Sequence, residues 1–243
     1  MLFRRVAQHV KAQNWTAVGI DFVIVVIGVF IGIQVANWND ARAENERIAA
    51  QLESFRTELI LARDDFATSQ AYYADRIEGV SILRRRLEEG GDFPADEFNP
   101  LVVSAIRGGS LNMAFPGYEE LTTTGAISKV SDKRLRGLLH DWDTQLTLIN
   151  NTDVVLEDAR ANLIIPVVLE GTNFGNALQA DERYMDLTVA NRFEFDIEEI
   201  RSNRNLDGAL AMRQLQAKQQ LNTLNDFIGI TEALIVALDE ADT

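Results

Sequence analysis

An apolar stretch over residues 17–37 constrains this chain more than any other feature. It carries one charge, Asp21, and one strongly polar amide, Gln34, before its last residue. A helix rises about 1.5 Å per residue, so this stretch covers roughly 30 Å, which is the thickness of the hydrocarbon core of a bilayer. Trp15 and Trp38 bracket it, and indole rings favour the membrane–water interface. The sequence therefore predicts a transmembrane helix over residues 17–38, with Trp15 and Trp38 as interface anchors.

The two flanks of this helix favour one orientation. Residues 1–16 form a basic flank with Arg4, Arg5 and Lys11 and no acid, whereas acids and bases alternate after Trp38. Positive charge tends to stay on the cytoplasmic side, so we expect a cytoplasmic N-terminus and a periplasmic domain over residues 39–243, in a bacterial inner membrane. A cleaved signal peptide is the alternative, because residues 41–43 have the small-x-small form. The apolar run is longer than the ~7–15 residues usual for such a signal, which favours the membrane span.

One face of the predicted span combines an acid with small residues. Its members lie within about 40° of one line on a helix: they are Asp21, Val25, Gly28, Gly32 and Val35. Gly28 and Gly32 have the G-x-x-x-G spacing that allows two helix backbones to approach closely. Asp21 has three interpretations: a solvated carboxylate near the cytoplasmic interface, a contact with another helix, or a group that carries protons. We expect this face to be a helix–helix interface.

The charge of the chain excludes some partners for the soluble part. The net charge is −14, and the first 38 residues contribute +2, so the rest carries −16. So acidic a domain is a poor ligand for nucleic acid or for an anionic lipid surface. The chain has no cysteine, which rules out disulfides and thiolate sites.

Heptad-like stripes of apolar residues dominate the soluble part. The first runs through Ile48, Leu52, Phe55, Leu59, Ala62 and Phe66 and extends through Tyr73, Val80, Leu83 and Leu87, with weaker positions between. A second runs from Leu135 to Ile149, and a third from Ala217 to Leu238. Each spacing of four and three residues is typical of an amphipathic helix. The predicted fold is all-α: one N-terminal transmembrane helix that continues, as one rod, into an elongated antiparallel helical bundle.

Turn and cap signals place the helix boundaries. The glycines at 90–91 end the first long helix, and a short helix is expected over residues 96–106. Residues 112–125 are expected to be irregular. The Ser131-Asp132 pair caps a helix that runs to about Leu163, before Pro166. Residues 167–194 are expected to be a loop with short helices, and a last helix to cover residues 196–239.

Two motifs give the chain a family resemblance. Residues 21–40 hold an acid, an Ile- and Gly-rich apolar run, and then Gln-Val-Ala-Asn-Trp-Asn. Residues 118–139 hold a Leu-x-x-x-Gly turn that leads into a Leu- and Arg-rich helix. The chain resembles an uncharacterised family of bacterial single-pass membrane proteins, best over about the first 60 residues. The acid here is Asp21, where the family more usually has Glu. The resemblance supports the architecture and implies no activity.

The sequence shows no recognisable catalytic or cofactor motif. His140 has Asp141 and Asp143 beside it, but this spacing does not bring the three side chains to one helix face, so no metal site is predicted. We expect a protein that is not an enzyme and uses no cofactor, a scaffold or accessory subunit whose span binds another membrane protein or a second copy. The alternative is a periplasmic sensor or ligand-binding module that works through a partner, with its ligand near residues 112–125.

Overall fold

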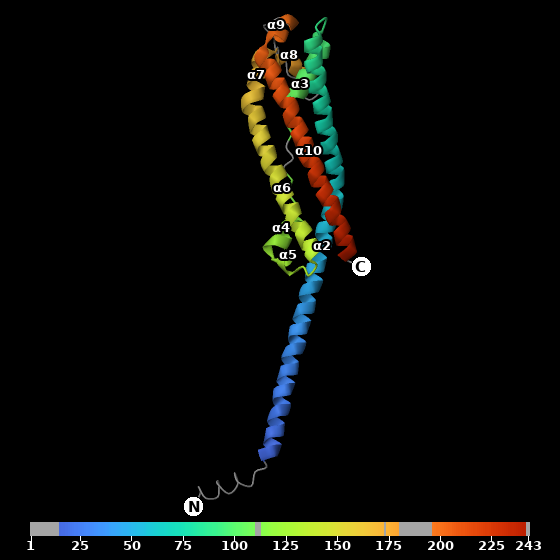
Figure 1. Cartoon of the computed structure of the whole chain (residues 1–243), viewed down its shortest axis with the longest axis vertical. Helices are drawn as coiled ribbons and strands as arrows, with labels where there is room; N and C mark the ends of the chain where they lie inside the picture. Colours follow the sequence, from blue (N-terminus) through green and yellow to red (C-terminus); the bar gives the residue numbers. More distant parts are fainter. Residues whose placement is uncertain (1–14, 110–112, 173, 180–195, 242–243) are drawn as a thin grey trace, which may run out of the picture. The chain divides into compact units, whose positions relative to one another are not determined.

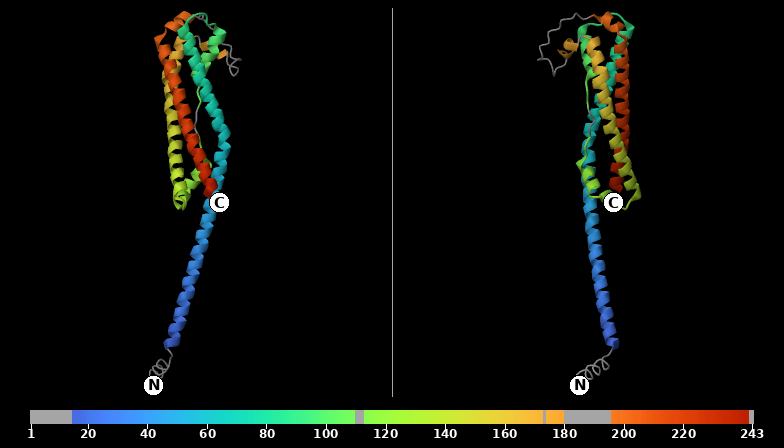
Figure 2. Two further views of the ribbon diagram at one scale, coloured as in Figure 1. Left: turned by 45° about the vertical axis from the view of Figure 1, so that its right-hand side comes forward. Right: turned by 90° about the vertical axis from the view of Figure 1, so that its left-hand side faces the viewer.

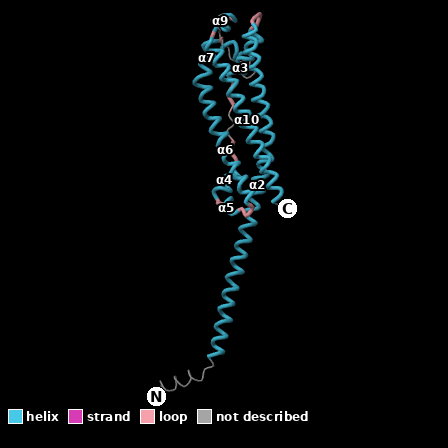
Figure 3. The backbone as a smooth tube through the Cα atoms, in the orientation of Figure 1, coloured by secondary structure: helices cyan, strands magenta, loops and turns pink. Residues whose placement is uncertain are grey.

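In a computed structural model, the chain is built from helices. The structure describes residues 15–109, 113–172, 174–179 and 196–241, and within these ranges every regular element is a helix (Figure 3). The long helices are α2 (Trp15–Glu89), α6 (Lys133–Ala159) and α10 (Arg204–Ala241). The shorter ones are α3 (Ala95–Ile106), α4 (Pro116–Thr123), α5 (Ala126–Lys129), the π-helical turn η1 (Arg160–Ile164), α7 (Ile165–Gly171), α8 (Phe174–Gln179) and α9 (Ile197–Ser202). The expected all-helical fold class is confirmed for the described residues.

The chain divides into two compact units, residues 1–51 and residues 52–243. In the first unit, α2 carries the apolar stretch, and every residue from 18 to 43 is exposed. An 18-residue window of this helix has a mean hydropathy of 2.5 and no buried share. The described part of this unit is therefore a helix that is long and apolar enough to span a membrane.

In the second unit, the predicted stripe on α2 forms part of the hydrophobic core. Phe55, Leu59, Val80 and Leu83 are at most 1% exposed, and Tyr73 is buried with them. The helix stops at Glu89 because Gly90 and Gly91 follow with positive φ angles of 75° and 84°, where a side chain would be strained. The end of the first long helix is thus where the sequence predicts it.

Helices α6 and α10 pack against each other, and α2 lies beside them over its later residues (Figures 1 and 2). Trp142 of α6 is fully buried, with its ring centroid 5.1 Å from that of Phe55 on α2 and 5.4 Å from that of Phe227 on α10. Its indole Nε1 donates to Thr231 Oγ1 at 2.9 Å. A window of α10 also passes a hydropathy test for a membrane span, but 39% of it is buried in the domain, as in a core helix.

Two of the expected helix boundaries, both near a proline, are wrong. The stretch over residues 112–125 is not irregular throughout: Pro116 starts α4, because its fixed φ angle suits the first turn of a helix. The helix after Asp132 does not stop before Pro166. A π-helical turn at residues 160–164 leads into α7, which takes Pro166 in its first turn, where no amide donor is needed.

The last expected helix is two helices. Asn203, with an extended backbone at φ −78° and ψ 94°, separates α9 from α10. Its Oδ1 accepts hydrogen bonds from the amides of Asn205 and Leu206, both at 3.1 Å. A capping side chain of this kind ends one helix and begins the next. Of the expected loop over residues 167–194, residues 173 and 180–194 lie outside the described part.

Candidate functional site

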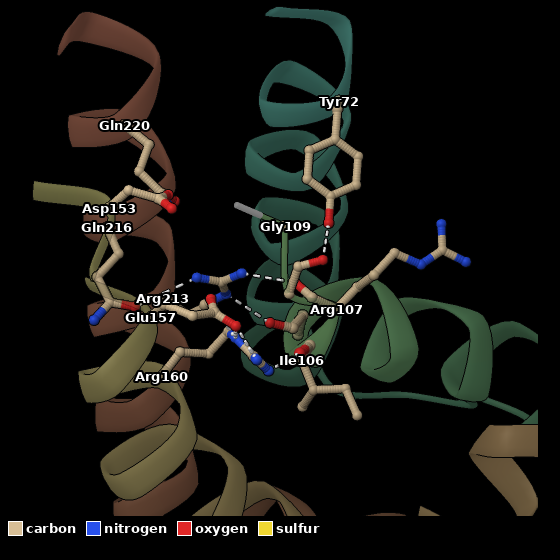
Figure 4. A network of polar contacts seen from close by, with 12 residues as sticks. Tyr72, Ile106, Arg107, Gly109, Asp153, Glu157, Arg160, Arg213, Gln216 and Gln220 are labelled. Carbon is tan, nitrogen blue, oxygen red and sulfur yellow. Dashed lines mark hydrogen bonds and ion pairs between the residues drawn. The ribbon is translucent and has the colours of Figure 1, made fainter. Parts of the chain in front are cut away.

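Two arginines meet at the C-terminal end of α3. Arg213 on α10 donates from Nε to the carbonyl of Ala105 at 2.9 Å and from Nη2 to that of Arg107 at 2.7 Å. Arg160 in η1 donates from Nη1 to the carbonyl of Ile106 at 2.7 Å (Figure 4). The last carbonyls of a helix lack partners within the helix, and they carry the negative end of its dipole. The two guanidinium groups therefore cap α3.

Two tyrosines of α2 extend this set of contacts. The hydroxyl of Tyr72 donates to the carbonyl of Gly108, and that of Tyr73 donates to the carbonyl of Gly109 at 3.2 Å. Five consecutive carbonyls, from residue 105 to residue 109, thus accept from side chains of three other elements. These hydrogen bonds hold the backbone of residues 105–109 in place where the chain leaves α3.

Both glycines of this segment lie so close to neighbouring side chains that an added Cβ atom would force a neighbour to move. A Cβ atom on Gly108 would lie 2.5 Å from Nη2 of Arg160, and one on Gly109 would lie 2.5 Å from the ring of Tyr72. The sequence marks Gly108 and Gly109 as a break between helices. The structure adds that they allow the backbone to approach an arginine and a tyrosine closely.

An ion pair holds Arg160 in position. Glu157 accepts from Nε of Arg160 at 2.8 Å and also contacts its Nη2. This hydrogen bond lowers the pKa of Glu157 below the ordinary range of a glutamate, although partial burial acts in the opposite direction. The pair therefore stays ionised at neutral pH, with its positive partner directed at the end of α3.

Arg76 is the unusual member of the cluster. It is 2% exposed, its guanidinium lies 4.1 Å above the centroid of the Tyr72 ring, and both Nη1 and Nη2 are buried without a hydrogen-bond partner. Burial lowers the pKa of Arg76 to about 9, and the nearby charges of Arg213 and Arg160 lower it further than Glu157 raises it. Burial also lowers the pKa of Arg213 to about 10. Both side chains remain protonated at neutral pH.

Positive charge therefore gathers inside a domain that is acidic overall. Arg76, Arg213 and Arg160 lie together, with Glu157 paired to one of them. Asp153, 3% exposed, accepts from Nε2 of Gln220 at 3.1 Å at the edge of the cluster (Figure 4). Such an arrangement is suited to holding negative charge, either the carbonyl dipoles of α3 or an anion.

This cluster is not among the sites predicted from the sequence, although the sequence contains a signal for it. Arg76 stands three residues after Tyr73 and four before Val80, at a weak position of the first stripe. Arg213 likewise stands between Leu210 and Ala217 at the same spacing. A charged residue at a core position of an apolar stripe indicates a buried polar layer, because burial requires it to find partners.

The residues of the predicted helix–helix interface lie on the exposed part of α2. Gly28 and Gly32 have no atom within 4 Å of an added Cβ, and Val25 and Val35 are 62% and 54% exposed. Asp21 is also exposed. The structure contains one chain, so the interface stays a prediction.

The predicted membrane anchors and the histidine are placed as follows. Trp38 is 64% exposed, while the side chain of Trp15 and the basic residues before it lie outside the described part. His140 is exposed on α6. Within the described ranges, no three or more His, Asp or Glu side chains gather in a group that could hold a metal ion.

The chain matches no protein-family model, no curated protein and no solved structure. The resemblance to an uncharacterised family of single-pass membrane proteins therefore stays a prediction that depends on the two motifs alone.

Proposed function

We propose that this chain is a single-pass membrane protein without enzymatic activity, whose helical domain is a scaffold or accessory subunit of a larger membrane assembly. The exposed apolar part of α2 is the observation that supports this most. Residues 18–35 would present a continuous surface of Val, Ile and Phe to water. Each such side chain gains about 1.5–3 kcal/mol when it leaves water, so a bilayer is the natural surrounding of this segment.

We place the protein in a bacterial inner membrane with its domain in the periplasm. The basic flank over residues 1–16 supports a cytoplasmic N-terminus, because Lys and Arg are retained on that side. Residues 39–243 then form the periplasmic part.

Within that part, α2 and α10 form an antiparallel pair of the proposed bundle. Contacts between them run in opposite order along the two helices: Arg63 pairs with Glu232, Gln70 with Asn225 and Arg84 with Gln214. Helix α6 adds a third long member through the contacts of Trp142.

The partner of this protein binds through the face of the span that holds Asp21, Gly28 and Gly32. Among the described residues, no atom lies within 4 Å of a Cβ added to either glycine, so a second helix has room to approach their backbone. A carboxylate at membrane depth is costly unless it faces another helix or water. Both features support a contact with another membrane protein or a second copy of this chain.

The experiment is mild detergent extraction of the native protein, followed by sizing and mass spectrometry of everything that co-purifies. We expect a defined complex that Gly28→Leu and Gly32→Leu weaken. Phe30→Leu is the matched control, because Phe30 lies about 180° around the helix from Asp21, at 3.6 residues per turn. A strict monomer with no companion, unaltered by either glycine variant, would contradict the proposal.

A second candidate function is a ligand-binding module. The buried, unpartnered guanidinium of Arg76 favours it. The ligand would then lie near the end of α3, and not near residues 112–125, where α4 and α5 form.

A further inference from the structure

Arg76 brings a positive charge into the domain, and no carboxylate of the described residues forms an ion pair with it, although Glu157 lies near enough to act on its pKa. Its two terminal nitrogens are buried and without a hydrogen-bond partner, and its guanidinium carbon lies 4.1 Å from the centroid of the Tyr72 ring. A buried charge that is not compensated costs several kcal/mol. Within the described part of the chain no group forms a hydrogen bond with these two nitrogens, so a bound species is a candidate to offset this cost.

The neighbouring charges increase this cost. Arg213 is 1% exposed and directs its guanidinium at the carbonyls of Ala105 and Arg107. Arg160 directs its own at Ile106 and is paired with Glu157. These contacts satisfy the donors of both arginines. The cluster then holds three guanidinium groups against two carboxylates, Glu157 and, at its edge, Asp153.

Two ordinary explanations do not remove the cost. Loss of the proton would remove the charge, but a pKa of about 9 keeps Arg76 protonated at neutral pH. A bound water would accept from Nη1 and Nη2, but a neutral molecule leaves the charge uncompensated. Arg76 needs an acceptor for its two hydrogen bonds and a negative charge to balance its own. An anion supplies both.

The surroundings limit the size of this anion. Arg76 and Tyr73 are 2% and 1% exposed, and the Tyr72 ring is close to the backbone at Gly109. The adjacent Nη1 and Nη2 groups of one guanidinium can hold a single halide ion or the two oxygens of a carboxylate. A bulky anion would have to displace the tyrosines.

We propose that Nη1 and Nη2 of Arg76 bind a small monovalent anion, a chloride ion or a short carboxylate such as acetate, within the polar layer formed by α2, η1 and α10. The anion completes the charge balance of the layer that caps α3. This site does not depend on the proposed membrane function.

The test is thermal unfolding of the full-length protein in detergent at constant ionic strength, with gluconate replaced stepwise by chloride, bromide or acetate. A specific site gives a saturable rise in Tm, of about 3–6 °C at a tenfold excess over Kd. We expect Arg76→Met to abolish the rise. Arg85→Met, an exposed arginine of the same helix, should retain it. A response to chloride and bromide alone would identify a halide site, and a response to acetate alone a carboxylate site.

A second measurement on the unaltered protein covers the case in which Arg76→Met does not fold. Crystals grown with bromide should show an anomalous peak in contact with Nη1 and Nη2 of Arg76, or crystals grown with acetate should show a carboxylate there. Water in that position in both crystals would overturn the proposal. So would the same Tm in all anions, or an equal anion response in Arg76→Met and the unaltered protein.

Discussion

Single polar residues at core positions shape the interior of this domain. Arg76 and Arg213 occupy places in apolar stripes where an aliphatic residue would pack more simply. Arg213 is satisfied by two carbonyls at the end of α3. Removal of one partner from such a layer leaves buried polar groups without hydrogen bonds, which costs more than the bonds themselves contribute.

The close approach at Gly109 gives a prediction at this scale. Gly109→Ala places a Cβ atom 2.5 Å from the Tyr72 ring, so the ring must move, and it loses its hydrogen bond to the carbonyl of Gly108. We expect the free energy of unfolding to fall by about 1–3 kcal/mol, measured by denaturant unfolding followed by circular dichroism. Gly137→Ala is the control: it is exposed within α6 with no atom within 4 Å of the new Cβ, and should stabilise by about 0.5–1 kcal/mol. Equal stability of the two variants would contradict this prediction.

At the scale of elements, helix ends are set by side chains that satisfy free backbone groups. Asp132 begins α6 because its Oδ1 accepts from the amides of Arg134 at 2.7 Å and Leu135 at 3.3 Å. Arginines from two other elements satisfy the carbonyls at the end of α3. The first kind of end is local in sequence, whereas the second requires the folded domain.

The cap of α6 gives a prediction for this element. Asp132→Ala leaves two amides of the first turn without an acceptor, so we expect a loss of about 1 kcal/mol in the free energy of unfolding. Asp141→Ala, the same substitution at an exposed position inside the helix, should leave stability unchanged or slightly higher. Urea unfolding of both variants measures the difference, and a cost at Asp141 equal to that at Asp132 would exclude a capping role.

At the scale of the whole molecule, ion pairs make the stability of the domain depend on pH. Hydrogen bonds from Arg160 and Arg63 lower the pKa values of Glu157 and Glu232 in the folded state. A lowered folded-state pKa gives stability that is present above the unfolded value, near 4.3, and lost as the pH falls below it. Burial raises the pKa of Glu58, which acts in the opposite direction for that one group.

We therefore expect the urea midpoint to fall between about pH 5 and pH 3. Glu157→Gln should lower the free energy of unfolding by about 1–2 kcal/mol at pH 7 and by less at pH 3.5, because the carboxylate of the unfolded state is then largely protonated and part of the contribution of the ion pair is already lost. Glu88→Gln, at an exposed glutamate near the end of α2, is the control and should follow the unaltered protein. A difference for Glu157→Gln that does not change with pH would argue against the ion pair.

The sequence by itself determined the helical fold class, the apolar span, the core stripes and the helix ends at Asp132 and at Gly90-Gly91. These features depend on short-range properties: the period of apolar residues, the length of the apolar run, and capping groups a few residues away. The places where it was wrong, at Pro116, Pro166 and Asn203, are those where one residue is compatible with either a turn or the first turn of a helix.

Only the tertiary structure decided what lies around Arg76. Its partners and neighbours come from positions as distant as Arg160 and Arg213, and nothing local in the sequence states which three helices will bring them together. A charged residue at a core position of an apolar stripe, such as Arg76, indicates that its side chain needs a polar or charged partner in the folded domain. Which group provides it is fixed by packing, because burial and hydrogen-bond geometry depend on all the elements at once.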